Sequence, residues 1–392
     1  MKYTRRAFFR TIGFMDYAKK ALLKHKELKG KIAIRLKEKL DNKEQLSTYY
    51  TPGVAAVSDY IAKHPQEARE YTWLNNSVAV VSDGSAVLGL GDIGPLGALP
   101  VMEGKAMLFK HFAGIDAVPI VLDVHTADGI VDAVKAIAPS FGGINLEDIA
   151  APICFEVEER LKAGLSLPIM HDDQHGTAIV VLAGLINAMK VTGRELSNAK
   201  IVVAGAGAAG TAIIKLLYAY ARPSIFAVDS KGVVSANRRD LNAAKKKLLE
   251  FTNKTNADGS LEDILVGADV FIGVSKAGSL NTRLVQRMNK DPIIFALANP
   301  TPEIMPDEAK QAGAAIVATG RSDFANQVNN SLAFPGIFRG ALDNNVSAIT
   351  EKHKIAVAEA IARLVHNPTP DKVIPDPFEA GLVEAVAKVF QE

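Results

Sequence analysis

The chain contains almost no cysteine and almost no excess of charge. Cys154 is the single cysteine among 392 residues, so no disulfide can form within the chain. A lone cysteine is also not a zinc site, and its isolation favours a reducing cytoplasm. The formal net charge is only +2, which is too small for the strong field of a protein that binds nucleic acid or an anionic membrane. We therefore expect neither among its partners.

The N-terminal region lacks a long uncharged segment. No run there approaches the roughly 20 apolar residues that a membrane-spanning helix needs. Arg5 and Arg6 resemble a twin-arginine export signal, but a lysine-rich amphipathic stretch follows where an apolar segment and a cleavage site belong. Met15 is an alternative start, and residues 1–14 are then an N-terminal extension. We expect a cytoplasmic protein without a membrane span.

Regular alternation of short apolar runs with helical stretches marks the rest of the chain. Apolar residues make up 48% and charged residues 22%, as in globular proteins, and the length suits two domains. β-branched runs separated by helices predict parallel sheets with crossover helices. The expected strands are 78–81 and 119–123 in a first set, and 201–205, 225–229, 270–274, 293–298 and 315–318 in a second.

The domain boundary is predicted near residues 165–175. A buried helix over 177–191, ending near Gly193, separates the two sets of strands. We predict an α/β protein with an N-terminal α/β domain over 15–170 and a doubly wound Rossmann domain over 171–340. A C-terminal helical tail follows over 341–392, with helices at 355–365 and 381–390.

A glycine-rich turn follows the first strand of the second domain. The sequence Gly205-Ala206-Gly207-Ala208-Ala209-Gly210 has the GxGxxG spacing of dinucleotide-binding turns. Gly205 permits a tight turn, Gly207 lets the backbone approach a pyrophosphate, and Gly210 allows helix and strand to pack closely. Because the turn lies between a strand and a helix, we predict an NAD(P) site. Its candidate residues are Gly205, Gly207, Ala208, Ala209, Gly210, Asp229 and Ser230.

The acid at the end of the next strand bears on the choice of cofactor. Asp229 can accept hydrogen bonds from the adenosine ribose, and its charge would repel a 2′-phosphate. Ser230 and Lys231 follow directly and are a plausible phosphate grip, and Arg238 and Arg239 are close enough in sequence to reach. Because the carboxylate is fixed and the lysine is flexible, we predict NAD to be favoured slightly over NADP.

Two acidic pairs point to a divalent cation. Glu147-Asp148 and Asp172-Asp173 would each, alone, be ordinary solvated loop residues. Together near a domain boundary they can hold Mg²⁺ or Mn²⁺, which prefer oxygen ligands. His171 and His175, four residues apart, suggest zinc as an alternative, but no third nitrogen or sulfur ligand accompanies them.

Three other segments of the first domain suggest a reactive site. Lys105 lies just inside a glycine turn, and a lysine whose pKa is lowered beside a metal or in a desolvated cleft can act as a base. Tyr50 precedes the turn Thr51-Pro52-Gly53. The glycine-rich stretch 84–97 is expected to pass close to a ligand or to the other domain. Taken alone, a lysine such as Lys105 is more often a surface charge, and a tyrosine such as Tyr50 is more often a residue at the edge of the core.

Taken together, these motifs resemble the malic enzyme family in its compact prokaryotic form. The resemblance runs from about Tyr17 to the end. Its six motifs, in order, are Tyr50–Val54, Val87–Asp92, Gly143–Asp148, His171–Thr177, Ala298–Pro300 and Asn329–Asn330.

The resemblance implies a role for each matching residue. Tyr50 would be the catalytic acid and Lys105 the catalytic base. The metal ligands would be Glu147, Asp148 and Asp173, with Asp172 as their supporting partner. Asn299 and Asn330 would contact substrate, and Asn299 also the cofactor. Larger relatives carry an arginine before the Val87–Asp92 motif, and this chain has none. Backbone N–H groups at Gly84 and Ser85, or a partner subunit, are candidates to hold that malate carboxylate.

The implied reaction is oxidative decarboxylation of (S)-malate to pyruvate and CO2 with reduction of NAD(P), dependent on Mg²⁺ or Mn²⁺. The resemblance also implies decarboxylation of oxaloacetate and a homodimer. Two alternatives stay open: a malolactic enzyme, which converts malate to lactate, and a catalytically silent NAD-binding or regulatory protein on the same scaffold.

Overall fold

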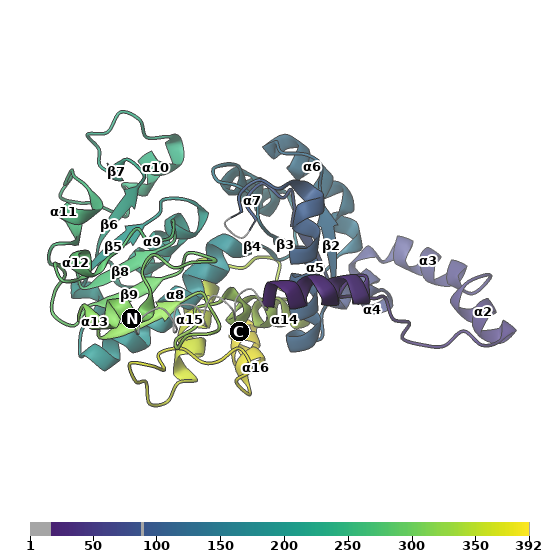
Figure 1. Cartoon of the computed structure of the whole chain (residues 1–392). Coiled ribbons are helices and arrows are strands. Elements are labelled where there is room, and N and C mark those ends of the chain that lie inside the picture. Colours follow the sequence, from purple (N-terminus) through teal and green to yellow (C-terminus); the bar gives the residue numbers. More distant parts are fainter. Residues whose placement is uncertain (1–16, 88–89, 392) are drawn as a thin grey trace.

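The computed structural model describes residues 17–87 and 90–391, so the predicted extension 1–14 lies outside it. Figure 1 shows two α/β bodies side by side, a helical tail beneath them and an arm that projects from the first body. The first described helix covers residues 17–28. The mixed α/β class predicted from the sequence is confirmed.

The first body is built on a four-stranded, wholly parallel sheet in the order β2-β1-β3-β4. All six residues of its inner strand β1 are buried, as expected for a strand whose two faces are covered by helices. The strands are β1 (Ser77–Ser82), β2 (Asp116–Val121), β3 (Gly143–Leu146) and β4 (Ile169–His171), and the main helices are α5 (Gly94–Ala113), α6 (Ala127–Ile137) and α7 (Ile153–Gly164).

The second body contains a six-stranded sheet in the order β10-β9-β8-β5-β6-β7, with only β7 antiparallel. The five strands predicted here are all present, and the doubly wound arrangement is confirmed. They are β5 (Lys200–Ala204), β6 (Ser224–Asp229), β8 (Val270–Gly273), β9 (Ile293–Ala296) and β10 (Ile316–Thr319), joined by the short β7 (Gly232–Val233). Helix α9 (Ala208–Ala221) follows β5.

One long helix, α8 (Asp172–Thr192), connects the two bodies. It begins directly after β4, and its buried side chains join one core that includes Val78 of the first sheet and Val203 of the second. By length and composition α8 could cross a membrane, but two thirds of that segment is buried inside the protein. It is therefore a core helix. The predicted start at residue 177 is wrong, because α8 begins at Asp172. Asp172 and Asp173 lie in its first turn, where negative side chains interact favourably with the positive end of the helix dipole.

The tail closes over the junction. Helix α14 (Phe334–Asp343) packs on α5 of the first body, and α15 (Glu351–Arg363) packs on α8 and α9. Helix α16 (Leu382–Ala387) then packs on α14. The two predicted tail helices are thus present, the second ending earlier in a 3₁₀ turn at Lys388–Phe390.

The arm carries α2 (Lys43–Tyr49) and α3 (Val54–Lys63). It leaves the first body on the side opposite the second body (Figure 1). No residue of either helix is buried. The arm therefore stands apart from the core that positions the rest of the chain.

Candidate active site

The side chain of Lys105 lies at the centre of the predicted site. Helix α5 places it at 7% exposure. Its Nζ is 2.5 Å from Oδ2 of Asp172 and 2.9 Å from Oε1 of Glu147, and it lies 4.3 Å from the ring centroid of Phe334. Four elements therefore fix one ammonium group: α5, α8, the loop after β3 and α14.

The pKa of Lys105 differs from the sequence-based expectation. Burial alone would lower it, but the carboxylates of Asp172 and Glu147 outweigh burial and raise it above its ordinary value. The prediction of a lowered pKa is thus wrong for the chain by itself. The physical reason is that two negative carboxylates contact this amine and stabilise its protonated form.

Next to Lys105 lies a cluster of three carboxylates. Glu147, Asp148 and Asp173 each offer an oxygen within 4.8 Å of the other two. Burial raises the pKa of Asp173 to about 6, with Asp172 adding to the effect, and burial also raises that of Glu147. In both cases the positive charge of Lys105 does not fully offset the effect of burial on the carboxyl group. An all-oxygen donor set of this size and net charge fits Mg²⁺ or Mn²⁺.

The loop after β3 is bent to form this cluster. Asp148 has φ +54°, an uncommon backbone conformation for a residue other than glycine. Its N–H donates to Oδ2 of Asp173 at 2.7 Å. Asp173 is 33% exposed at its side chain, whereas Glu147 is 5% exposed. The cluster is therefore accessible from the Asp173 side.

The two histidines do not form a zinc site. Nε2 of His175 pairs with Glu158 at 2.8 Å and its Nδ1 accepts from Nζ of Lys354 at 3.0 Å, so both ring nitrogens are occupied. Glu158 is buried, and His175 and Lys162 overcome the effect of burial and hold its pKa well below the ordinary value. Sequence reasoning missed Glu158, whose carboxylate also accepts the backbone N–H of His171 at 3.0 Å. It thereby braces the start of α8.

Asp172 and Asn330 meet at Gly176. A Cβ on Gly176 would lie 2.0 Å from Oδ1 of Asp172 and 3.0 Å from Cβ of Asn330. The absence of a side chain at Gly176 therefore allows the Asn330 segment to approach the helix turn that bears Asp172. Burial raises the pKa of Asp172 to about 6 although Lys105 opposes it.

The glycine-rich segment after β1 closes on itself and on the acidic loop. Gly84 has φ +73°, and a Cβ there would lie 2.3 Å from the carbonyl oxygen of Gly94. Its N–H donates to Ser82, and that of Ser85 donates to the buried, unpredicted Asp83. Because both donors are engaged, these N–H groups do not form the expected anchor for a carboxylate.

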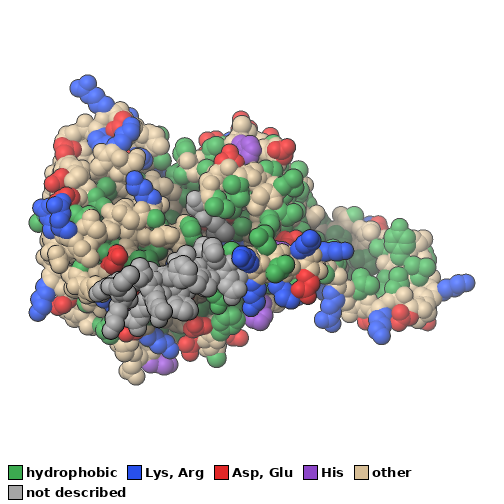
Figure 2. All heavy atoms as spheres, viewed as in Figure 1, with side chains coloured by type: hydrophobic (Ala, Val, Ile, Leu, Met, Phe, Trp, Pro, Cys, Tyr) green, Lys and Arg blue, Asp and Glu red, His purple; other side chains and the backbone are tan. Residues whose placement is uncertain are grey.

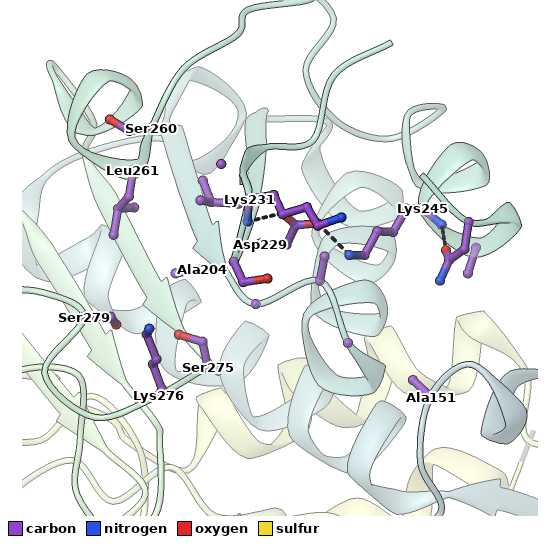
Figure 3. A pocket seen from close by; sticks show the side chains of 18 of the residues that line it. Ala151, Ala204, Asp229, Lys231, Lys245, Ser260, Leu261, Ser275, Lys276 and Ser279 are labelled. Carbon is purple, nitrogen blue, oxygen red and sulfur yellow. Dashed lines mark hydrogen bonds and ion pairs between the residues drawn. The ribbon is translucent and has the colours of Figure 1, made fainter. Parts of the chain in front are cut away.

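The glycine turn of the second body lines a cavity of about 950 Å³, shown in Figure 3. A Cβ on Gly205, which has φ +119°, would lie 2.6 Å from the carbonyl oxygen of Val274, and one on Gly210 would lie 1.7 Å from that of Gly205. Nothing lies within 4 Å of a Cβ on Gly207, the residue that caps α9. Ala208 and Ala209 form the first turn of that helix. Gly205 thus permits the tight turn, Gly207 leaves open space, and Gly210 allows close packing, in the order predicted.

Asp229 lies on the cavity wall beside Ser230 and Lys231. Its carboxylate accepts from Arg238 at 2.7 and 3.1 Å and from Nζ of Lys245 at 2.5 Å; Figure 3 shows Lys245 reaching it. These contacts overcome burial and lower its pKa to about 2. Sequence reasoning noted Arg238 as close enough to reach a cofactor phosphate and did not consider Lys245. The charge of Asp229 is therefore largely balanced by the protein.

Asn299 follows β9 on the surface of the second body. Its side-chain amide lies against Gly320, because a Cβ added to Gly320 would be 2.9 Å from the amide nitrogen. The nearby Glu303 is fully buried and accepts the N–H groups of Ser275 and Ala298, each at 3.0 Å. Glu303 thus joins the ends of β8 and β9 and positions the Asn299 turn. No motif in the sequence marks this glutamate.

Tyr50 is not part of this constellation in the chain. It follows α2 on the arm and is 66% exposed. Within residues 17–87 and 90–391, the side chains that pair with Nζ of Lys105 or lie against it are Asp172, Glu147 and Phe334, and none of these three carries a hydroxyl. The structure therefore brings together Lys105 and the predicted carboxylates, and leaves Tyr50 apart from them.

A Rossmann cavity in the second body, together with a buried lysine and a carboxylate cluster in the first, is typical of a dinucleotide-dependent oxidoreductase of two domains. Comparison with known proteins gives its family. Residues 29–162 match the malic enzyme N-terminal domain, and residues 174–385 match the malic enzyme NAD binding domain. The chain belongs to the malic enzyme family.

Individual relatives agree over most of the chain. A bifunctional malic/malolactic enzyme of Bacillus subtilis is 55% identical, over 95% of this chain and 92% of its own length. An NADP-dependent malic enzyme of Halomonas elongata is 44% identical, over 94% and 90%. The crystal structure of an NAD-dependent malic enzyme from Thermotoga maritima matches with a TM-score of 0.92 and 49% identity, over 95% of this chain and 98% of that one.

Proposed function

We propose that the protein oxidatively decarboxylates (S)-malate to pyruvate and CO2, reduces NAD(P), and decarboxylates oxaloacetate. The observation that carries this proposal is the buried Lys105–Asp172 pair beside the cluster of Glu147, Asp148 and Asp173. We also propose that the enzyme is cytoplasmic and a homodimer.

Glu147, Asp148 and Asp173 would hold Mg²⁺ or Mn²⁺. A divalent cation held by these residues would supply Lewis-acid chemistry, lowering the pKa of the substrate hydroxyl and stabilising the negative charge left by the departing CO2. Their crowding without a matching positive charge supports this assignment. Added positive charge at the cluster also favours the neutral form of Lys105, which is the form that can accept a proton.

Lys105 would take the proton of the C2 hydroxyl as hydride leaves for the bound nicotinamide. To do so it must first lose its own proton, and Asp172 is 2.5 Å away. Asp172 accepts a hydrogen bond from this amine and would hold it in position for the transfer. Asn330, next to Asp172, and Asn299, at the end of β9, would orient the substrate, with Asn299 also facing the cofactor.

For the cofactor we propose a slight preference for NAD. Asp229 is positioned to accept the ribose hydroxyls, which supports NAD, while Arg238 and Lys245 balance its charge and reduce the repulsion of a 2′-phosphate. The preference should therefore be small. The test is the ratio of kcat/KM for the two cofactors, and a ratio above about ten for NADP would contradict it.

The activity test is incubation with (S)-malate, Mn²⁺ and each cofactor, followed by quantification of pyruvate, lactate and reduced cofactor. We expect pyruvate and reduced cofactor in equal amounts. Lactate without net reduction would instead identify a malolactic enzyme, the second activity named for the Bacillus subtilis relative. Lys105→Met should abolish turnover and keep NAD binding. Lys110→Met, which removes an exposed lysine on the same helix, is the matched control and should stay active.

A further inference from the structure

A second cavity lies where the two bodies and the tail meet. Its volume is about 310 Å³, and its walls come from α7 of the first body, the connecting helix α8, α9 of the second body and α15 of the tail. Phe155 lines both this cavity and the nucleotide cavity, so the two are neighbours. Among the described residues that line the second cavity, none is assigned above to malate, metal or cofactor.

Three lysines, one from each part of the chain, line this cavity. They are Lys162 on α7, Lys215 on α9 and Lys354 on α15. On the face of the molecule seen in Figure 2, by contrast, lysines and arginines are spread over both bodies and the arm, with acidic side chains among them. Three ammonium groups around one cavity create a local positive potential that attracts an anion.

The carboxylates of the cavity wall balance only part of this charge. Glu158 is buried there, but it already pairs with Lys162 at 2.6 Å and with His175 at 2.8 Å. Glu159 and Glu351 also line the cavity, and both are exposed. Water and salt screen the charge of exposed carboxylates, so the inner part of the cavity keeps an excess of positive charge.

Lys215 and Lys354 carry this excess. Within residues 17–87 and 90–391, no carboxylate oxygen lies within 4.0 Å of either ammonium nitrogen, and Nζ of Lys354 donates instead to the ring of His175 at 3.0 Å. Burial, together with the positive charges of Lys162 and Lys215, lowers the pKa of Lys354 to about 8. The lysines are therefore close enough to repel each other, and an anion between them would relieve that repulsion.

Two uncharged polar side chains beside the lysines fit the oxygens of an anion. Thr211 lines the cavity, is 5% exposed and offers a hydroxyl. Gln174 also borders the cavity, and its buried Nε2 has no hydrogen-bond partner in the described part of the chain. A buried donor without an acceptor is rare in proteins because it costs free energy. An anion oxygen would supply that acceptor.

The lining favours a phosphoryl group over a carboxylate. No arginine is among the described residues that line the cavity, so it lacks the planar fork that pairs with a carboxylate. Ammonium groups act as point charges, which suit the concentrated charge of a phosphoryl group. The volume equals that of about ten water molecules, which is more than inorganic phosphate fills and enough for a small organic phosphate.

We propose that this cavity binds a small organic phosphate, with its phosphoryl group between Lys215 and Lys354 and within reach of the Thr211 hydroxyl. The bound anion links the second body to the tail beside α7 of the first body. A ligand that contacts several parts of a protein favours the arrangement of those parts that it binds best. The site therefore serves regulation and is separate from the site proposed to oxidise malate.

Calorimetric titration of the full-length, NAD-saturated, metal-free protein with phosphoglycolate tests the site. NAD occupies the glycine turn, and omission of metal keeps the probe from the carboxylate cluster. We expect one probe per chain, and binding at least about tenfold weaker in Lys215→Met and in Lys354→Gln, because each loses a charge-assisted contact. Lys354→Gln keeps a hydrogen-bond donor for His175. Lys352→Met, at an exposed position of α15, is the matched control and should bind the probe as the wild type does.

Three results overturn the proposal: no binding of the probe at about 10 mM, displacement of the probe by NAD, or unchanged affinity in both variants. Inorganic phosphate or tricarballylate, a tricarboxylate without phosphorus, binding as tightly as phosphoglycolate would overturn the assignment to an organic phosphate. Lys215→Met should keep the Tm and the malate turnover of the wild type, which separates lost binding from unfolding. Failure of the proposed function looks different, because the wild type would then make no pyruvate and still bind the probe.

Discussion

Replacing single glycines of the nucleotide turn should separate stability from binding. Gly210→Ala places a Cβ 1.7 Å from the carbonyl oxygen of Gly205, and backbone cannot move away as a flexible side chain can. Overpacking of this kind costs about 1–3 kcal/mol, while alanine gains up to about 1 kcal/mol over glycine within a helix. We expect the overlap to prevail, with a net loss on the order of 1–2 kcal/mol.

Gly207→Ala is the matched variant. A Cβ there meets no protein atom within 4 Å, and φ is −90°, so the unfolding free energy should change little. The methyl group would instead occupy the space left for a pyrophosphate, and NAD affinity should fall at least about tenfold.

Two assays decide the matter. Thermal unfolding of the nucleotide-free protein should show a Tm that is lower for Gly210→Ala, by about 2–4 °C per kcal/mol for a domain of this size. The Tm of Gly207→Ala should equal that of the wild type. Calorimetric titration with NAD should show the larger loss for Gly207→Ala. If Gly207→Ala destabilises the fold or Gly210→Ala leaves Tm unchanged, the reasoning from contact distances is wrong.

Three further substitutions test the charged groups. The pKa of Asp173 is raised to about 6, so the metal-free folded state keeps a proton that the unfolded chain releases near about pH 4. The free energy of unfolding therefore falls as pH rises from about 4 to 6. At a pH above 6, Asp173→Asn should raise the Tm of the metal-free protein and abolish the increase in Tm caused by Mn²⁺. Glu158→Gln removes the buried negative charge that pairs with Lys162 and His175. It should lower the free energy of unfolding, measured in urea, by about 3 kcal/mol. Glu159→Gln, at the exposed neighbouring residue, should leave that free energy unchanged. Lys245→Ala removes a cation from Asp229 and should increase the kcat/KM ratio of NAD to NADP, and an unchanged ratio would show that Lys245 does not face the ribose.

Local patterns in the sequence were enough to predict the sheets and the nucleotide turn. β-branched runs between helices gave the strands of the second body because each is a continuous buried run, such as Ile293–Ala296. The glycines at 205 and 210 could be assigned because the turn geometry follows directly from their spacing. Glu147, Asp148 and Asp173 come from two separate segments of the sequence. The two acidic pairs predicted a cation site, and the resemblance to a family assigned these three residues as its ligands.

Other features depend on tertiary contacts that no local pattern records. Glu158 and Glu303 are single acids in ordinary sequence, and their roles arise from the backbone N–H groups that happen to face them. Arg238 lies nine residues beyond Asp229 on an irregular loop, so its turn toward that carboxylate was not predictable from spacing. Tyr50 carries a recognisable motif, but the motif does not record that the residue follows α2 on the arm, apart from Lys105.

The junction at His171 links the candidate metal cluster of the first body to the second body. His171 ends β4 and caps α8, so the bodies are joined by strand and helix without a flexible linker. An ion held by Glu147 and Asp148 on one side and by Asp173 on the other would resist any shear of α8 against the first sheet. Dinucleotide binding, which orients the second body, would then strengthen ion binding, and the ion would strengthen dinucleotide binding by the same factor. Neither affinity is then a property of its own site alone.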